Sequence, residues 1–269
     1  MITVSCGPCD SPAVNHLSID AMIEPVARAL QVAMVDVGGT LWPNSWPLRE
    51  TDGAGRVHRV AAAMPAIDPA VVEALVADLT RSSRHIDPAW EAVSPDSGTL
   101  VATCLERQGL PRDQQTVMLI RRAMAVPVFD RLKPLPGAPE LLAAIHDLGM
   151  RTVITSNTYW RDAESYWDDF RLLGMAEHID EVVTSVDAGR LKPHPAVFEL
   201  AMQRAGVPAE RCAVIGNSEV NDVEPALKLG MLAILVHPDD PRPESSRAHA
   251  IAPDLWACAE ALRTMLQSS

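Results

Sequence analysis

The stretch MVDVGGTLWP, residues 34–43, decides how this chain is interpreted. It continues the short apolar run QVAMVDV at residues 31–37, which is ended by Gly38 and Gly39. Such a run is typical of a central strand in a parallel sheet, buried on both faces. Asp36 stands near the carboxyl end of this predicted strand, the place where open parallel sheets form their ligand sites.

The sequence after residue 136 predicts the rest of the sheet. Helical spacing alternates with short apolar runs, a pattern typical of an α/β fold with a Rossmann-like, doubly wound parallel sheet. The predicted helices cover residues 138–148, 160–173, 195–205 and 222–229, with a last helix at 253–266. The predicted strands cover residues 151–155, 181–185, 212–216 and 231–236.

An accessory helical unit is predicted between the first strand and the rest of the sheet. Residues 42–66 are rich in Trp, Pro, Arg and Gly and are expected to form a loop, after which helical spacing recurs over 68–83, 98–108 and 113–125. The expected organisation is a leader and short helix at 1–30, core at 31–44, a helical cap insertion at 45–132 and the remainder of the core at 133–269.

Composition limits the partners. The chain of 269 residues carries 23 Lys and Arg against 35 Asp and Glu, a net charge of −12, which opposes binding to a nucleic-acid backbone. Apolar runs stay short of the roughly 20 residues that span a bilayer, and the N-terminus lacks a basic segment followed by an apolar one. We therefore expect no nucleic acid and no membrane partner, and a cytoplasmic location.

Five cysteines are present. Cys6 and Cys9 form CGPC, but no convincing strand precedes this motif, so we interpret it as part of a tail rather than as a redox site. Cys104, Cys212 and Cys258 stand among apolar residues and are expected to be reduced core residues.

Polar residues follow the carboxyl ends of several predicted strands. They are Asp36, Gly38, Gly39 and Thr40 after the first, Ser156 and Asn157 after the second, Lys192 in a loop with Pro193 and Pro195, and Gly216, Asn217, Ser218, Asn221 and Asp222 after a later one. Because these strand ends meet at one edge of the sheet, the residues predict a shared site for Mg²⁺ and phosphate.

Four segments in order carry a family resemblance: DVGGTL, VITSNT, GRLKPHPAVF and VIGNSEVNDVEPALKLGM. They resemble the four motifs of the haloacid dehalogenase-like (HAD) superfamily, in the branch whose helical cap is inserted after the first motif. The resemblance covers about residues 31–236. It implies that Asp36 is a nucleophile forming a covalent aspartyl intermediate, that Ser156 hydrogen-bonds the transferring group, and that Lys192 offsets negative charge.

The resemblance also implies a cofactor and a substrate class. Mg²⁺ is expected as the cofactor, held by Asp36, the backbone carbonyl of Gly38, Asn217 and Asp222. A small phosphorylated metabolite is the expected substrate, and the chain is expected to be a monomer or homodimer. The residues expected to contact substrate are Gly39, Thr40, Asn157 and Trp42.

Two positions depart from the family pattern. Gly38 stands where the phosphatases of the family have a second Asp, so protonation of the leaving group loses a catalyst typically worth 10²–10⁴-fold. Asn217 stands where the family has the first acidic residue of its metal-binding loop. Its amide oxygen can bind Mg²⁺ without contributing charge, so the affinity should fall, and Glu219 is a candidate to compensate for this loss through a water molecule. Candidate replacements for the missing acid are His58, Arg59 and His85 in the insertion.

Gly38 leaves three functions open. The first is a Mg²⁺-dependent phosphoryl hydrolase, weakened or specialised for substrates that leave easily or bring their own proton. The second is a carbon-centre hydrolase of the 2-haloacid dehalogenase type, whose members also lack the second Asp. The third is a non-catalytic relative that binds a phosphorylated ligand or protein.

Two pairs of aromatic residues stand close to predicted strand ends: Trp42 with Trp46, and Tyr159 with Trp160. They are expected either to line an apolar part of the pocket or to seal the insertion against the core.

Overall fold

The structure, a computed structural model, describes residues 30–44, 52–83, 96–236 and 246–267. The predicted leader helix, the CGPC motif, Trp46 and His85 lie outside the described residues.

A parallel sheet of six strands forms the centre of the molecule, in the order β3-β2-β1-β4-β5-β6. The strands are β1 (Val32–Val35), β2 (Arg151–Ser156), β3 (Glu181–Thr184), β4 (Cys212–Gly216), β5 (Leu232–Val236) and β6 (Ala250–Ala252). β1 pairs on both sides, with Val35 opposite Ile154 of β2 and Ile215 of β4. The stretch that carries Asp36 is therefore a central strand, as its apolar sequence predicts.

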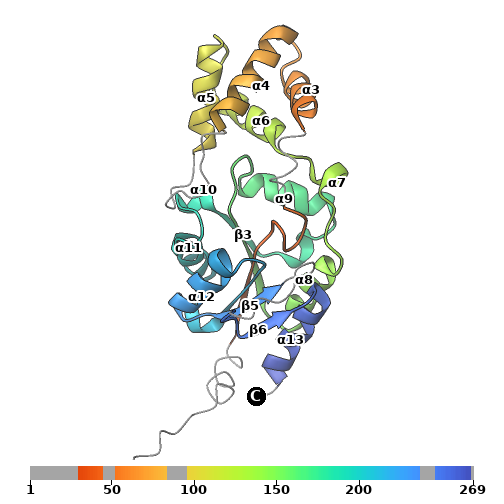
Figure 1. Cartoon of the computed structure of the whole chain (residues 1–269), viewed down its shortest axis with the longest axis vertical. Coiled ribbons are helices and arrows are strands. Elements are labelled where there is room, and N and C mark those ends of the chain that lie inside the picture. Colours follow the sequence, from red (N-terminus) through yellow and green to blue (C-terminus); the bar gives the residue numbers. More distant parts are fainter. Residues whose placement is uncertain (1–29, 45–51, 84–95, 237–245, 268–269) are drawn as a thin grey trace, which may run out of the picture.

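Helices cover both faces of this sheet (Figure 1). They are α7 (Val128–Arg131), α8 (Ala138–Asp147), α9 (Ala163–Leu172), α10 (Ser185–Ala188), α11 (Ala196–Ala205), α12 (Glu224–Leu229) and α13 (Leu255–Gln267), with short turns at η1 (Ala176–His178), η2 (Ala209–Arg211) and η3 (Glu219–Val223). Ala33 and Val35 face α8, α9 and α13, whereas Val32 and Met34 face α11 and α12. The two buried faces make this an α/β sandwich of three layers.

Among the described residues between β1 and β2, four further helices lie at one end of the core (Figure 1). They are α3 (Gly53–Ala63), α4 (Pro69–Ser83), α5 (Ser97–Arg107) and α6 (Gln114–Met124). We call them the helical insertion. Their apolar sides share a hydrophobic cluster, which Tyr159 and Trp160 join from the loop after β2. The insertion therefore contacts the core beside the carboxyl end of β2, and these two aromatic residues seal it there.

The main error in the predicted elements concerns residues 42–66, which were expected to form a loop and include α3. Gly53 and Gly55 have low helix propensity and obscure the pattern, while Val57, Val60 and Ala61 supply an apolar face at helical spacing. Packing of this face against α6 overrides the local preference. The short elements α7, α10 and β6 were also not predicted.

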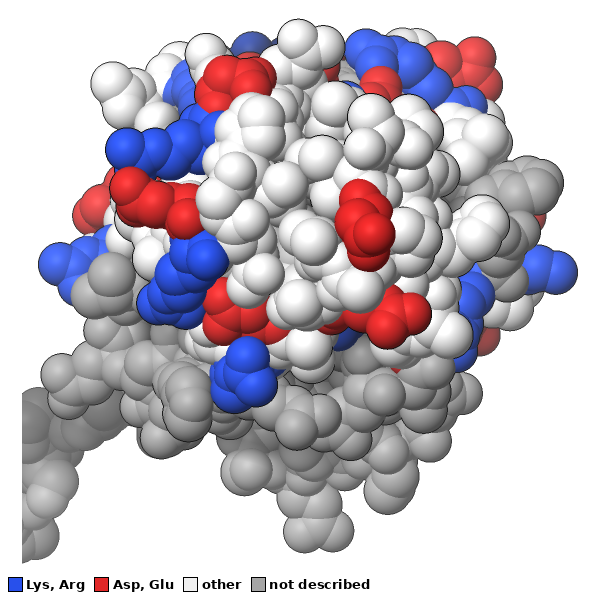
Figure 2. All heavy atoms as spheres, turned by 90° about the horizontal axis from the view of Figure 1, so that it is seen from above, with Lys and Arg blue, Asp and Glu red and all other residues white. Residues whose placement is uncertain are grey.

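The prediction that three cysteines are reduced residues of the core agrees with the structure. Cys104, Cys212 and Cys258 are buried free cysteines, and burial raises the pKa of the Cys212 thiol to about 11. None of the helices in the described part of the chain is long and apolar enough to cross a membrane. Viewed from above, the described Lys and Arg side chains lie around the margin of the face, whereas Asp and Glu lie both at the margin and within the face (Figure 2).

Candidate active site

The loop after β1 turns sharply and presents Asp36 beyond the end of the strand. The backbone N–H groups of Thr40, Leu41 and Trp42 all donate to the carbonyl of Val37. Gly39 has φ +86°, and a Cβ there would come within 2.2 Å of the Asn217 side chain. Glycine is required at this position by both the left-handed backbone and the approach of Asn217.

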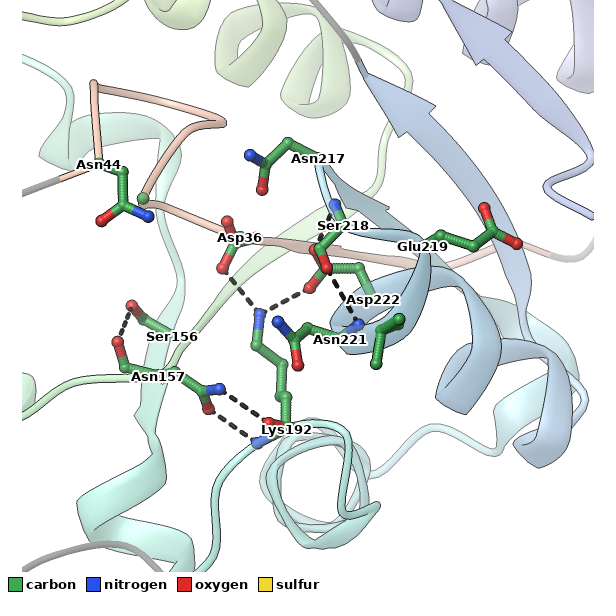
Figure 3. A pocket seen from close by; sticks show the side chains of 12 residues that line it. Asp36, Asn44, Ser156, Asn157, Lys192, Asn217, Ser218, Glu219, Asn221 and Asp222 are labelled. Carbon is green, nitrogen blue, oxygen red and sulfur yellow. Dashed lines mark hydrogen bonds and ion pairs between the residues drawn. The ribbon is translucent and has the colours of Figure 1, made fainter. Parts of the chain in front are cut away.

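One lysine joins two carboxylates at the centre of the site (Figure 3). Lys192 Nζ donates to Asp36 Oδ1 and to Asp222 Oδ1, each at 2.7 Å, and to the carbonyl of Thr155 at 3.1 Å. The second Asp36 oxygen accepts from Thr40 Oγ1 at 3.0 Å. All three donors of the ammonium group are therefore used, and the nucleophile candidate is held at both oxygens.

Burial and charge act against each other in this cluster. Burial opposes the charged form of Lys192, but Asp222 and Asp36 outweigh it and hold the lysine pKa above its usual value. Burial, assisted by the charge of Asp36 and opposed by Lys192, raises the pKa of the Asp222 carboxyl to about 6. With both carboxylates ionised the cluster carries one net negative charge, which favours a further cation in the site.

The acidic loop after β4 is built around Asp222. Ser218 caps the short π-helical turn η3, its Oγ accepting from the backbone N–H of Asn221, and its own N–H donates to Asp222 Oδ2 at 3.1 Å. A Cβ on Gly216 would lie 2.3 Å from the Asp222 carboxyl carbon, so glycine there allows the carboxylate its position. Glu219 accepts from Ser246 and from the N–H of Arg247, and it points away from Asp36 (Figure 3).

The last residue of β2, Ser156, and the residue after it, Asn157, are both hydrogen-bonded to neighbouring elements. Ser156 Oγ lies 2.9 Å from the hydroxyl of Tyr166, on α9. Burial raises the pKa of Tyr166, which therefore keeps its proton. The Asn157 side chain accepts from Lys192 N–H at 2.7 Å and donates to Lys192 C=O at 2.9 Å.

These groups open on a pocket of about 470 Å³. Its lining residues are Asp36, Gly38, Asn44, Ser156, Asn157, Lys192, Asn217, Ser218, Glu219, Val220, Asn221 and Asp222. The structure thus brings together all three predicted catalytic residues and all four predicted metal ligands. Oxygen and nitrogen groups dominate the lining, as suits a polar ligand.

Three of the four predicted substrate contacts lie outside this lining. Trp42 is 2% exposed and packs on the rings of Tyr166 and Phe170 in the core. Thr40 is fully buried and holds Asp36, while Gly39 serves the turn. Gly39, Thr40 and Trp42 stand near Asp36 in the sequence because they build the loop, and of the four predicted contacts only Asn157 lines the pocket.

The two described candidates for replacing the missing acid, His58 and Arg59, lie outside the pocket lining. His58 is exposed on α3. Arg59 pairs with Asp52 at 2.6 Å and donates to the carbonyls of Ala123 and Ala125.

Sequence reasoning missed two residues of the site. Asn44 lines the pocket, and Tyr166 reaches Ser156 from a helix whose apolar face gave no sign of a polar role. The motif spacing in the sequence contains no signal for either.

The oxygen donors in the pocket suit a hard cation. Among the described residues no group of three or more His, Cys, Asp or Glu converges on one point. Asp36 and Asp222 nevertheless supply two carboxylates, with Asn217 and Gly38 in the same lining. Mg²⁺ is usually bound by one or two carboxylates together with phosphate oxygens of the substrate, so this donor set fits that ion.

Residues 30–230 match the family model of the haloacid dehalogenase-like hydrolases. The chain belongs to this family.

Curated relatives match the chain over part of its length. The glyceraldehyde 3-phosphate phosphatase of Methanothermobacter thermautotrophicus is 35% identical over 109 residues, which are 40% of this chain and 47% of that protein. The haloacid dehalogenase-like hydrolase domain-containing protein 3 of Xenopus laevis is 36% identical over 106 residues, 39% of this chain and 42% of that protein. The chain therefore matches less than half the length of either relative.

Solved structures resemble it over most of the fold. A 2-haloacid dehalogenase from Pseudomonas syringae has a TM-score of 0.59 at 22% identity, covering 87% of this chain and 98% of that one. A HAD phosphatase from Thermococcus onnurineus has a TM-score of 0.53 at 17% identity, with the same coverage. Similarity at these identities supports the shared fold.

Proposed function

We propose that this hydrolase removes phosphate from small phosphorylated metabolites, with Asp36 as the nucleophile and Mg²⁺ as the cofactor. One observation carries the proposal: the Asp36 carboxylate faces a polar pocket while Lys192 bridges it to Asp222 at 2.7 Å on each side. The bridge keeps a lysine charge beside the position where a phosphoryl group would gather negative charge.

The chemistry proceeds in two displacements. A carboxylate oxygen of Asp36 forms a bond to phosphorus, the bond from phosphorus to the leaving oxygen breaks, and that oxygen departs with the bonding electrons. Water then attacks the aspartyl phosphate, which restores the carboxylate and releases inorganic phosphate. Ser156 donates a hydrogen bond to the transferring group, and Lys192 offsets its charge.

Asp36, Asp222, Asn217 and the Gly38 carbonyl are the residues that would hold Mg²⁺. When bound, the ion supplies Lewis-acid polarisation of the phosphoryl oxygens. Asn217 contributes no charge, so we expect a lower affinity than a third carboxylate would give.

Gly38 sets the preference among leaving groups. It lines the pocket and carries no side chain to protonate the departing oxygen. For alkyl phosphates, the absence of a general acid typically lowers the rate by 10²–10⁴-fold, which is roughly 3–5 kcal/mol of activation free energy. The carboxylate and phenolate leaving groups of acyl and aryl phosphates depart without a proton, so hydrolysis of these phosphates is slowed less.

The substrate class rests on the relatives. Four of the matched proteins are named glyceraldehyde 3-phosphate phosphatases, and the pocket of about 470 Å³ suits a ligand of that size range. The helical insertion would act as the cap that closes over the strand ends and selects the substrate.

The test is intact mass after incubation with acetyl phosphate and Mg²⁺, with released phosphate followed in parallel. A phosphoryl adduct on the wild type and none on Asp36→Asn is the expected result. Absence of both adduct and phosphate release from the wild type contradicts the proposal. Release of halide from 2-haloacids in the same samples would assign carbon-centre chemistry instead.

A further inference from the structure

Lys192 lies in a turn between α10 and α11, outside the strands of the sheet. Its backbone N–H and C=O are both bound by one side chain, that of Asn157, at 2.7 Å and 2.9 Å. The two bonds run in opposite senses, as they would between paired strands (Figure 3). A carboxamide is the side chain that presents one donor and one acceptor side by side in this way.

We propose that Asn157 is a positioning residue that sets the place of the Lys192 ammonium group, rather than a substrate contact. The inference deepens the proposed function, because it concerns how the same site is assembled. Asn157 follows β2 directly, so its two hydrogen bonds fix the turn that carries Lys192 relative to the end of this strand.

The Lys192 ammonium group must be placed accurately, because it bonds three acceptors at once. The group must reach Asp36, Asp222 and the Thr155 carbonyl together, and the Lys192 side chain is 2% exposed. A displacement of the turn would break short ion pairs in a buried environment, where an unpaired charge is costly. The Asn157 bonds fix the backbone from which this side chain extends.

The test measures the accessibility of Lys192 and needs no substrate. The sequence holds three lysines, Lys133, Lys192 and Lys228. Lys228 is 71% exposed at its side chain and Lys133 is also exposed, so both serve as internal references. Acetylation by a low concentration of acetic anhydride at pH 8 is followed at each lysine by peptide mass spectrometry.

Wild type should acetylate slowly at Lys192. Asn157→Ala and the isosteric Asn157→Asp, which loses the donor to Lys192 C=O, should raise the Lys192 rate at least tenfold relative to Lys228. Asn221→Ala removes another asparagine of the pocket, which is not among the hydrogen-bond partners of Lys192, and it should leave the Lys192 rate as in wild type. Circular dichroism confirms that each variant is folded, and Asn157→Asp provides the answer if Asn157→Ala does not fold.

Kinetics supply the second arm of the test. A positioning role predicts that both Asn157 variants lower kcat more than they raise KM for acetyl phosphate. An unchanged Lys192 acetylation rate in the folded Asn157 variants would overturn the proposal, as would a raised KM with unchanged kcat. If the wild type hydrolyses no phosphate, the acetylation result still stands, so failure of the proposed function is separately visible.

Discussion

At the scale of single residues, the site depends on one buried positive charge between two carboxylates. Lys192 balances Asp36 and Asp222 at equal distances of 2.7 Å. The remaining contacts of these carboxylates come from Thr40 and from the N–H of Ser218. Local hydrogen bonds and one ion-pair bridge thus hold the Asp36 carboxylate, the proposed nucleophile, in place in the absence of a ligand.

Titration of Asp222 should make stability depend on pH in the absence of metal. Its pKa is about 6 in the folded protein, above the ordinary value of about 3.9. Between these values the folded state binds more protons, so this group favours folding at pH 4–5 and that contribution is lost as pH rises through 6. In EDTA, the Tm at pH 5 minus the Tm at pH 7.5 should be more positive for wild type than for Asp222→Asn. Equal differences in the two proteins would show that Asp222 titrates normally.

Gly216 should tolerate no side chain. Since a Cβ there would lie 2.3 Å from the Asp222 carboxyl carbon, Gly216→Ala should displace the carboxylate and cost about 1–3 kcal/mol. Gly38→Ala is the matched control, because a Cβ at Gly38 meets nothing within 4 Å. Urea unfolding should show a lower free energy of unfolding for Gly216→Ala alone, and equal loss in both variants would contradict the steric account.

At the scale of elements, helix α9 links the core to the insertion. Its N-cap, Asp162, accepts from the N–H of Ser165 and forms an ion pair with Arg121 of α6. The neighbouring Arg161 pairs with Asp169 and donates to the carbonyl of Val126, which follows the insertion. Capping of a core helix and attachment of the insertion therefore share one carboxylate.

Substitutions of Asp162 should separate these two contributions. Asp162→Ala loses the cap and the ion pair and should lower the free energy of unfolding by about 1–2 kcal/mol. Asp162→Asn keeps an oxygen for the Ser165 N–H and should cost less, as should Arg121→Met, which leaves the cap intact. Equal losses from all three variants in urea unfolding would mean that the cap contributes nothing.

Elements were predictable from sequence where one periodicity dominated. The strand at Cys212–Gly216 was predicted to its exact bounds because it is an apolar run between turn signals. α3 was missed because its two glycines conceal an apolar face whose partner, α6, lies far away in the sequence. Asp36, Lys192 and Asp222 follow from motif order, whereas the Tyr166 contact with Ser156 depends on how α9 packs against the sheet.

At the scale of the whole molecule, the sheet carries the residues of the site at the carboxyl ends of its strands, and the insertion packs against the core close to them. The strand ends bring distant residues into one pocket: Asp36 and Asp222 are 186 positions apart in the sequence. The insertion contacts the core through Tyr159 and Trp160 at the same edge. Its arrangement over that edge could not be predicted, because helical periodicity shows which faces are buried and gives no direction in space.

The absence of a side chain at Gly38 is proposed to set the leaving-group preference of the site, and substitution at this position permits a direct gain-of-function test. Space is open around the Gly38 Cβ position and its φ lies outside the left-handed region, so Gly38→Asp can place a carboxyl group in the pocket. Gly38→Asn is the matched control, with the same shape and no proton to transfer.

The decisive measurement is kcat/KM for an alkyl phosphate and for p-nitrophenyl phosphate in wild type, Gly38→Asp and Gly38→Asn. Gly38→Asp should raise the alkyl value on the order of 10²-fold over Gly38→Asn and change the aryl value little. Two results together would contradict the proposal that position 38 lacks the general acid. They are equal kcat/KM values of Gly38→Asp and Gly38→Asn for the alkyl phosphate, and a wild type that already favours the alkyl phosphate over the aryl phosphate.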